Sequence, residues 1–320
     1  MKLIFLLSGE NVQLAKWEVI RLAEAYGTLK NFEHSGRLLI VSWVGDNFYH
    51  RLALSHEVAH LIAECRLTEL EDVFQSVKIF PAKLCVRVKS FIRINRTEIE
   101  RKLGEILWRR GATISVSEPR VIYRIYINSE ENCYVGVLKY VVNKKQFYLR
   151  RPNVRPYSAP FTIVPKFARA LINLGCARRN MLDPMCGTGS FLIEAELMNI
   201  SSTGIDFFKK TISGCAKNLR FFGLPSNLIV GDARTLPFKD ETFECIVTDY
   251  PYYRSTKSPS DLVELYEKTS EEFYRVLTKS AVLVTNIDVE DYFKNFKLVA
   301  KFKQRVHGSL TRRIYLFDKN

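Results

Sequence analysis

Short apolar runs and amphipathic stretches alternate along the second half of this 320-residue chain, and no other feature constrains its fold as strongly. A short apolar run predicts a buried strand, and an apolar stripe at helical spacing predicts a helix packed against the sheet. Strands are expected at 179–183, 202–206, 227–230, 243–248 and 280–286, and helices at 162–174, 189–199, 209–222 and 261–277. This alternation predicts an open parallel α/β sheet with helices on both faces. An antiparallel pair at 296–304 and 311–317 is expected to close it.

The first half of the chain mixes strands and helices without this alternation, which indicates an α+β arrangement. A helix is predicted at 97–110, with Thr97 as its N-cap and Glu100 completing a capping box. A second helix is expected at 12–26, and strands at 2–8, 37–43, 57–65, 84–92, 121–127 and 132–141. Between the halves, residues 144–160 hold three prolines and three arginines and predict a stiff, basic linker.

The net charge of +14 is concentrated in one central segment. Residues 77–155 carry 18 basic and 6 acidic side chains, a net charge of +12, whereas residues 1–76 have a net charge of −3. A local basic band of this kind is typical of proteins that bind a polyanion, and we expect a nucleic acid.

The seven cysteines are scattered and never spaced Cys-x-x-Cys, so we expect neither a disulfide framework nor a metal site. This cysteine usage favours a cytoplasmic protein. The apolar N-terminus has no basic leader, and no apolar run reaches about 18 residues. We therefore expect no secretion and no association with a membrane.

Glycines and acidic residues stand where three successive strands of the predicted sheet end. In open α/β sheets, ligands bind beyond the carboxyl ends of the strands. The first strand ends at Asp183 and leads through Gly187 and Gly189 into a helix, a turn that lets backbone approach a ligand closely. Asp206 ends the second strand, where a carboxylate can accept both ribose hydroxyls, and Asp232 follows the third. Together they predict a nucleoside cofactor.

This arrangement resembles the Rossmann-like methyltransferases that use S-adenosylmethionine. The resemblance implies that Gly187 and Gly189 face the methionine part of the cofactor and that Asp183 faces its ammonium group. It further implies that Asp206 holds the ribose and that Asp232 contacts the adenine.

The fourth strand ends in Asp249-Tyr250-Pro251-Tyr252, a combination suited to chemistry on the amine of a planar base. The carboxylate of Asp249 and a backbone carbonyl can accept the two N–H bonds of such an amine, and Tyr252 can stack on a base that has left its helix. The segment resembles the Asp/Asn-Pro-Pro-Tyr/Phe motif of amino-group methyltransferases, which implies catalytic roles for Asp249, Pro251 and Tyr252. It departs from that motif at Tyr250. No metal is required, because the sulfonium already carries an activated methyl group.

Two more segments resemble archaeal THUMP-domain tRNA (guanine-10-N2) methyltransferases. Arg155-Pro156-Tyr157 with residues 161–174 is similar to the element that precedes the sheet in that family. Residues 83–137 resemble a THUMP domain, an RNA-binding module, at 85–89, 99–104 and 134–137. The resemblance implies a ferredoxin-like domain at 1–55, a THUMP domain at 56–143, a linker at 144–160 and a Rossmann-like methyltransferase domain at 161–320. The residues expected to bind RNA are Lys83, Arg87, Lys89, Arg101, Lys102, Arg109 and Arg110.

The function that this resemblance implies is methylation of the exocyclic N2 amine of guanosine 10 in tRNA. S-adenosylmethionine is the implied cofactor, tRNA is the implied partner, and the sequence leaves a protein partner open. N2-methylguanosine is the expected product, and the sequence leaves open whether a second transfer gives N2,N2-dimethylguanosine. Two alternatives stay open: a methyltransferase for another RNA or DNA base amine, and an inactive RNA-binding protein that keeps the fold.

Overall fold

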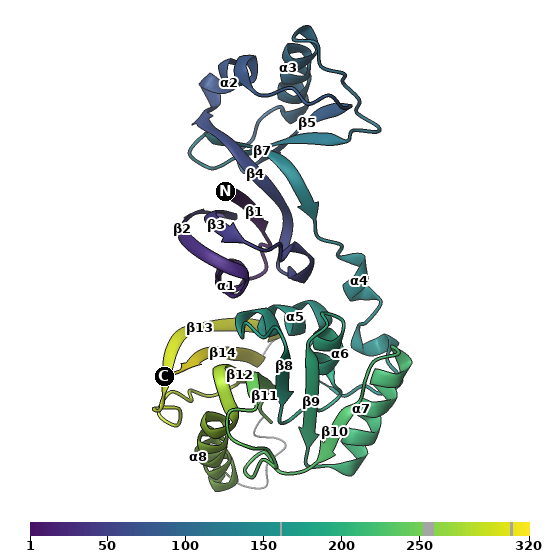
Figure 1. Ribbon diagram of the computed structural model, residues 1–320, viewed down its shortest axis with the longest axis vertical. Helices are drawn as coiled ribbons and strands as arrows, with labels where there is room; N and C mark the ends of the chain where they lie inside the picture. The colour runs from purple at the N-terminus through teal and green to yellow at the C-terminus, as the bar shows by residue number, and fades with distance from the viewer. Residues whose placement is uncertain (161, 252–258, 308–309) are drawn as a thin grey trace. The chain divides into compact units, whose positions relative to one another are not determined.

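The computed structural model describes residues 1–160, 162–251, 259–307 and 310–320 of the chain (Figure 1). Their contacts form two compact units. The first unit consists of Met1–Val12, Tyr26–Tyr49 and Ser55–Val142. The second consists of Gln13–Ala25, His50–Leu54 and Asn143–Asn320, so two short N-terminal segments belong with the C-terminal half of the chain.

The first unit is built on one seven-stranded sheet in the order β2-β3-β1-β4-β7-β6-β5. Its long strand β4 pairs antiparallel with β1 on one side and with β7 on the other. The regions expected as a ferredoxin-like domain and a THUMP domain therefore contribute to the same sheet. The strands are β1 (Lys2–Leu7), β2 (Gly27–Ser35), β3 (Leu38–Gly45), β4 (Ser55–Arg66), β5 (Leu84–Ser90), β6 (Val121–Ile127) and β7 (Asn132–Val141).

Two helices, α2 (Leu70–Ser76) and α3 (Arg96–Arg109), cover the β5 end of this sheet. Phe74 and Leu107 are buried in the core that these helices form with β5 and β6. The expected N-cap at Thr97 is wrong: the side chain of Asn95 accepts the N–H of Glu98 at 3.1 Å. Short 3-10 turns lie at η1 (Tyr49–Arg51) and η2 (Leu67–Glu69).

The second unit contains a seven-stranded sheet in the order β10-β9-β8-β11-β12-β14-β13. The first five strands of this order pair in parallel, and β14 pairs antiparallel with both β12 and β13. The expected parallel α/β sheet and its closing antiparallel pair are thus confirmed. The strands are β8 (Asn180–Asp183), β9 (Ser201–Asp206), β10 (Asn227–Val230), β11 (Phe243–Asp249), β12 (Leu277–Thr285), β13 (Phe296–His307) and β14 (Leu310–Lys319).

Helices connect these parallel strands, and right-handed crossovers decide which face each helix covers. From β8, the chain adds β9 and then β10 toward one edge of the sheet, so the connecting helices α6 and α7 lie on one face. From β11, it adds β12 toward the other edge, so the connecting helix α8 lies on the opposite face. Leu228 packs into the core with α6 and α7, whereas its neighbour Ile229 packs into the core with α8. The helices are α1 (Val12–Tyr26), α4 (Lys145–Tyr148), η3 (Pro152–Val154), α5 (Pro165–Leu174), α6 (Ser190–Glu196), α7 (Lys209–Phe221) and α8 (Pro259–Val276).

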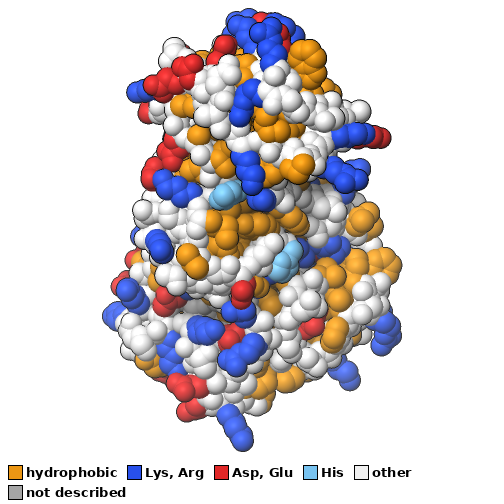
Figure 2. Space-filling view, turned by 45° about the horizontal axis from the view of Figure 1, so that its top comes forward, with side chains coloured by type: hydrophobic (Ala, Val, Ile, Leu, Met, Phe, Trp, Pro, Cys, Tyr) orange, Lys and Arg blue, Asp and Glu red, His pale blue; other side chains and the backbone are white. Residues whose placement is uncertain are grey.

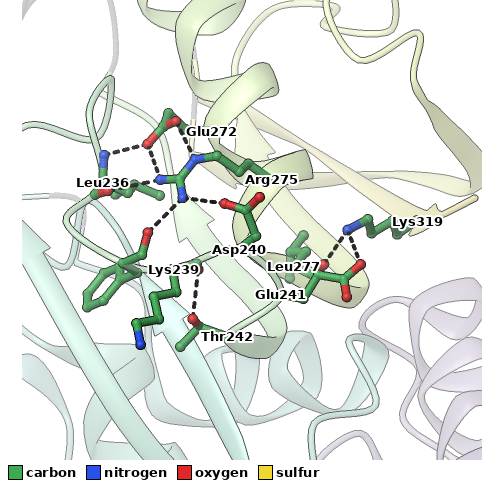
Figure 3. Close-up of polar contacts among 10 residues, drawn as sticks. Leu236, Lys239, Asp240, Glu241, Thr242, Glu272, Arg275, Leu277 and Lys319 are labelled. Carbon is green, nitrogen blue, oxygen red and sulfur yellow. Dashed lines mark hydrogen bonds and ion pairs between the residues drawn. The ribbon is translucent and has the colours of Figure 1, made fainter.

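The connection from β10 to β11 is held against the end of α8 by Arg275 (Figure 3). Its guanidinium donates to the carbonyl of Leu236 at 3.0 Å and pairs with Asp240 at 2.9 Å and with Glu272 at 2.8 Å. Glu272 in turn accepts the N–H of Leu236 at 2.6 Å. These contacts fix the path by which the chain enters β11, whose far end carries Asp249.

Candidate active site

A cavity of about 360 Å³ opens at the carboxyl ends of β8, β9 and β11. Its volume is within the range of sites that hold small molecules and cofactors. Three acidic side chains, those of Asp183, Asp206 and Asp249, line it together with Gly187 and Pro251. The sheet order explains this gathering, because β8 lies between β9 and β11 and the three strands run parallel.

The turn between β8 and α6 requires glycine at two positions. Gly187 has a φ of 51° and Gly189 a φ of 83°, backbone conformations that residues with a side chain seldom adopt. A Cβ at Gly189 would also lie 2.6 Å from the sulfur of Cys215 on α7. Gly187 lines the cavity, whereas Gly189 shapes the turn and ends it at the start of α6.

Asp206 ties the glycine turn to the end of β9. Its two carboxylate oxygens accept the N–H of Gly187 at 3.1 Å and the N–H of Phe208 at 3.0 Å. Burial raises the pKa of Asp206, and these backbone hydrogen bonds partly offset the effect. The side chain of Thr211 also donates to this carboxylate, which has about four acceptor positions in all, so Asp206 can still accept a hydroxyl donor from the cavity.

Asp183 is the most deeply buried acidic group of the cavity, with 1% of its surface exposed. It accepts the hydroxyl of Thr248 at 2.9 Å and the N–H of Met185 at 3.3 Å. Burial, reinforced by the negative charges of Asp249 and Asp206, outweighs these hydrogen bonds and raises the pKa of Asp183 to about 8. A cation bound beside this carboxyl would favour its ionised form.

Asp249 ends β11 and projects into the same cavity. Its carboxylate lies 3.7 Å from Nη2 of Arg312, a buried arginine on β14 that the sequence analysis does not single out. The sequence could have indicated Arg312, because alternate residues of a strand point to the same face and Arg312 lies two positions before the buried Ile314. Tyr252, the third expected catalytic residue, falls outside the described residues.

Tyr250, where the sequence departs from the amino-methyltransferase motif, fills the protein core. It is 1% exposed, its ring lies 4.4 Å from that of Tyr266, and its hydroxyl is 2.7 Å from that of Thr269. Both partners belong to α8, so this tyrosine fastens the end of β11 to that helix. The departure thus has a packing reason and leaves Asp249 and Pro251 at the cavity.

Asp232, the acid expected to meet adenine, does not line the cavity. Its carboxylate forms a two-pronged contact with Arg234, at 2.7 Å from Nη2 and 3.0 Å from Nε. The hydrogen bonds from the Arg234 side chain lower the pKa of Asp232. The geometry therefore brings together three of the four expected strand-end acids.

The segment expected as a linker is attached to the wall of this cavity. Arg150 donates two hydrogen bonds to the fully buried carboxylate of Glu194, at 2.6 and 3.0 Å, and Arg169 donates a third at 2.9 Å. Arg155 donates to the hydroxyl of Ser190 at 2.8 Å, and Ser190 lines the cavity. These contacts build residues 143–160 into the second unit.

The basic residues expected to contact RNA lie in the first unit, and most of them have acidic neighbours. Arg101, Lys102 and Arg109 pair with Glu98 or Glu105 along the same helix, α3. Lys83 pairs with Glu118 and Arg87 with Glu100, while Arg110 donates to the carbonyl of Phe74. Lys89 is exposed and has no partner in the described part of the chain. Basic side chains alternate with hydrophobic patches over the face that Figure 2 displays.

A second cavity, of about 560 Å³, lies within the first unit between α3 and β5. Arg87 and Arg101 line it beside Trp108, which is 65% exposed. Exposed aromatic rings next to arginines are the elements of a nucleic-acid contact. The groove therefore places Trp108 beside two of the residues that are expected to bind RNA.

Within residues 1–160, 162–251, 259–307 and 310–320, no helix is both long and apolar enough to span a membrane. The same residues contain no cluster of three or more His, Cys, Asp or Glu side chains that could hold a metal ion.

Comparison with known proteins finds relatives along the whole chain. Residues 152–314 match the family described as RMKL-like, methyltransferase domain. The tRNA (guanine(10)-N2)-dimethyltransferase of Pyrococcus abyssi is 32% identical, over 96% of this chain and 96% of that protein. The protein of the same name from Methanocaldococcus jannaschii is 27% identical, over 98% of this chain and 99% of that one.

Two solved structures share the fold. A crystal structure of TrmN from Thermus thermophilus has a TM-score of 0.53 at 20% identity and covers 100% of both chains. A putative methyltransferase complexed with SAH has a TM-score of 0.51 at 17% identity, covering 100% of this chain and 98% of that one.

Proposed function

Because the chain belongs to the family of tRNA (guanine(10)-N2)-dimethyltransferases, we propose that it transfers methyl groups to the exocyclic N2 amine of guanosine 10 in tRNA. The observation that carries this proposal is the 32% identity to the Pyrococcus abyssi enzyme, which extends over 96% of both chains. The cavity supports it, since it gathers Asp183, Asp206 and Asp249 where such a reaction needs them. N2-methylguanosine and N2,N2-dimethylguanosine are the products, and the cytoplasm is the expected location.

The residues of the cavity fit S-adenosylmethionine, which when bound supplies a methyl group activated by the sulfonium. The buried carboxyl of Asp183 suits an ammonium group, because a bound cation compensates the cost of its ionisation. Asp206 offers its remaining acceptor position to the ribose hydroxyls and can accept the second hydroxyl in place of Thr211. Gly187 presents backbone rather than a side chain to the ligand. Asp232 can accept a hydrogen bond from the adenine amine only after its hydrogen bonds from the Arg234 side chain have broken.

At the target base, the side chains at the end of β11 orient the amine. Asp249 accepts one N–H of the exocyclic amine, and a backbone carbonyl next to the rigid Pro251 accepts the other. This directs the nitrogen lone pair toward the methyl group and stabilises the positive charge that develops on nitrogen. Tyr252 stacks on the extruded base. After transfer, the extra proton on nitrogen leaves toward the carboxylate of Asp249.

The first unit is proposed to hold the tRNA away from the reacting base. Residues 77–142 of this unit carry 13 basic and 6 acidic side chains, a net charge of +7, and phosphate contacts supply most of the affinity of such surfaces. Lys83, Arg87, Lys89, Arg101, Lys102, Arg109 and Arg110 are the proposed contacts.

The test is mass spectrometry of nucleosides from unmodified tRNA after incubation with the protein and S-adenosylmethionine. The expected result is N2-methylated guanosine in a tRNA transcript with guanosine at position 10, and none in a matched transcript with adenosine there. Cofactor binding without turnover would instead support the inactive RNA-binding alternative. Methylation of a DNA duplex in preference to the tRNA would overturn the choice of substrate.

A further inference from the structure

Two adjacent aromatic rings are exposed at the edge of the active-site cavity. Phe207 and Phe208 follow Asp206 at the end of β9, line the cavity, and are each 63% exposed. Their ring centroids are 5.3 Å apart at an interplanar angle of 84°. Exposing two large apolar side chains costs free energy that burial would recover, so such a pair indicates a surface that is covered in use.

Two lysines follow these rings directly. Lys209 and Lys210 are exposed and open α7. Positive charge in the first turn of a helix is unfavourable, because the N-terminal end already carries positive partial charge. No carboxylate in the described part of the chain pairs with either lysine, so the local structure offers no reason for their charge. An anionic ligand would supply one.

The charge of the neighbouring cavity strengthens this argument. Asp206 and Asp249 line the cavity past which the RNA strand must lie, and their carboxylates repel a polyanion that approaches. The two unpaired lysines at the edge of the cavity offset that repulsion for an RNA strand that lies there. Aromatic rings interleaved with cations are the combination that binds single-stranded nucleic acid, the rings stacking on bases and the cations meeting phosphates.

We propose that the segment Phe207–Lys210, here called the lip, binds the RNA strand beside the extruded guanosine, with a ring stacked on a flanking base and the lysines on its phosphates. The inference rests on the proposed function and names a second contact with its substrate, on the catalytic unit rather than on the first unit. The alternative occupant of these rings is the adenine of the cofactor, and the experiment separates the two.

The test compares two variants with matched changes on the same helix. F208S/K209E alters the lip, and F221S/K217E alters an exposed phenylalanine and an exposed lysine near the other end of α7, outside the cavity lining. Stacking and one phosphate contact are worth about a 10-fold change or more, so the lip variant should raise the KM for tRNA by at least about 10-fold. The KM for S-adenosylmethionine should stay within about twofold, and F208Y, which keeps a ring, should retain the tRNA affinity.

Three results would overturn the proposal: a raised cofactor KM with unchanged tRNA affinity, unchanged values for both, or an equal loss in F221S/K217E. Loss of tRNA affinity in F208Y would rule out the stacking part of the proposal. The wild-type protein is assayed first on the same tRNA. Its failure to methylate would count against the proposed function, whereas an active wild type with an equally active lip variant counts against the lip alone.

Discussion

The carboxyl group of Asp183 makes the cavity sensitive to pH. Its pKa of about 8 lies above the ordinary aspartate value, so between about pH 4 and 8 the folded chain holds a proton that the unfolded chain has lost. This group's contribution to stability is therefore full below pH 4 and falls as the pH rises through 8.

Asp183→Asn should remove this dependence, because an amide keeps the shape and does not ionise. The difference in melting temperature between the variant and the wild type should grow in favour of the variant from pH 5 to pH 8. Cofactor affinity should fall in the variant at every pH, since the amide cannot balance an ammonium charge. Calorimetry of both proteins across this range checks the prediction, and parallel stability curves would contradict it.

Asp249→Ala should reduce methyl transfer by about 10²–10³ in kcat, the usual effect of losing a positioned hydrogen-bond acceptor. Cofactor affinity should stay nearly unchanged, because Asp249 lies at the end of β11 and the glycine turn and Asp206 lie at β8 and β9. Single-turnover kinetics and titration with S-adenosylhomocysteine measure the two quantities. Asp291→Ala, which removes an exposed carboxylate outside the cavity lining, is the control. Turnover in D249A comparable to that control would rule out the assigned role.

Single residues also mark where sequence reasoning stops. The strand-end position of Asp206 follows from the pattern, because parallel strands share a carboxyl edge. The pairings of Asp232 with Arg234 and of Asp249 with Arg312 cannot be predicted from that pattern. The Asp232–Arg234 pair depends on the direction of two neighbouring side chains, and the Asp249–Arg312 pair depends on a strand distant in sequence. Tyr250 illustrates the same limit, because its place in the core depends on the space beside α8, which the residues around position 250 do not indicate.

At the level of elements, strongly patterned segments are predictable and polar ones are not. The expected bounds of α1, β6, β7 and β10 agree with the structure because each carries a clear apolar run or stripe. The pattern misses β2, an edge strand whose residues are mostly exposed and which exists through pairing with β3. It also misses α2, which is seven residues long and buries only Leu70 and Phe74.

The segment 144–160 shows a different limitation. Its prolines and arginines are typical of a solvated linker, yet Arg150 and Arg155 are buried against α6. Their partners, Glu194 and Ser190, lie some 35 to 44 positions further along the chain. Composition predicts the solubility of a segment but not the pairing of its charges.

Glu194 should be the most sensitive acidic residue of this arrangement. It is fully buried between Arg150 and Arg169, so Glu194→Ala leaves two buried guanidinium groups without their shared counter-charge. Loss of one partner of a buried ion pair costs about 3–5 kcal/mol. Urea unfolding at neutral pH measures the change. Glu271→Ala, which breaks an exposed pair with Lys268, should cost at most about 1 kcal/mol and serves as the control. Equal effects of the two substitutions would argue against the buried network.

For the whole molecule, the division into units changes what a truncated chain can do. A fragment from residue 143 keeps the glycine turn and all the cavity residues, but it loses α1 and residues 50–54, which belong to the same unit. The buried Glu18 on α1 accepts Asn173 Nδ2 at 2.8 Å and the N–H groups of Ala53 and Leu54 at 2.9 and 2.8 Å. Arg21 pairs with Asp318 at 2.7 Å.

This fragment should therefore bind S-adenosylmethionine but unfold at a lower temperature than the full chain, because the surface that packs against α1 becomes exposed. Its affinity for tRNA should be weak and should fall less steeply with salt, since each lost phosphate contact removes about 0.7–0.9 from the slope of log K against log salt. Scanning calorimetry and binding titrations from about 50 to 200 mM salt test both parts. We expect residues 77–142, which the fragment lacks and which have a net charge of +7, to supply most of the salt dependence of the full chain. A fragment that bound tRNA as tightly as the full chain, with the same slope, would show that the catalytic unit alone makes the phosphate contacts and would leave the first unit without its proposed role.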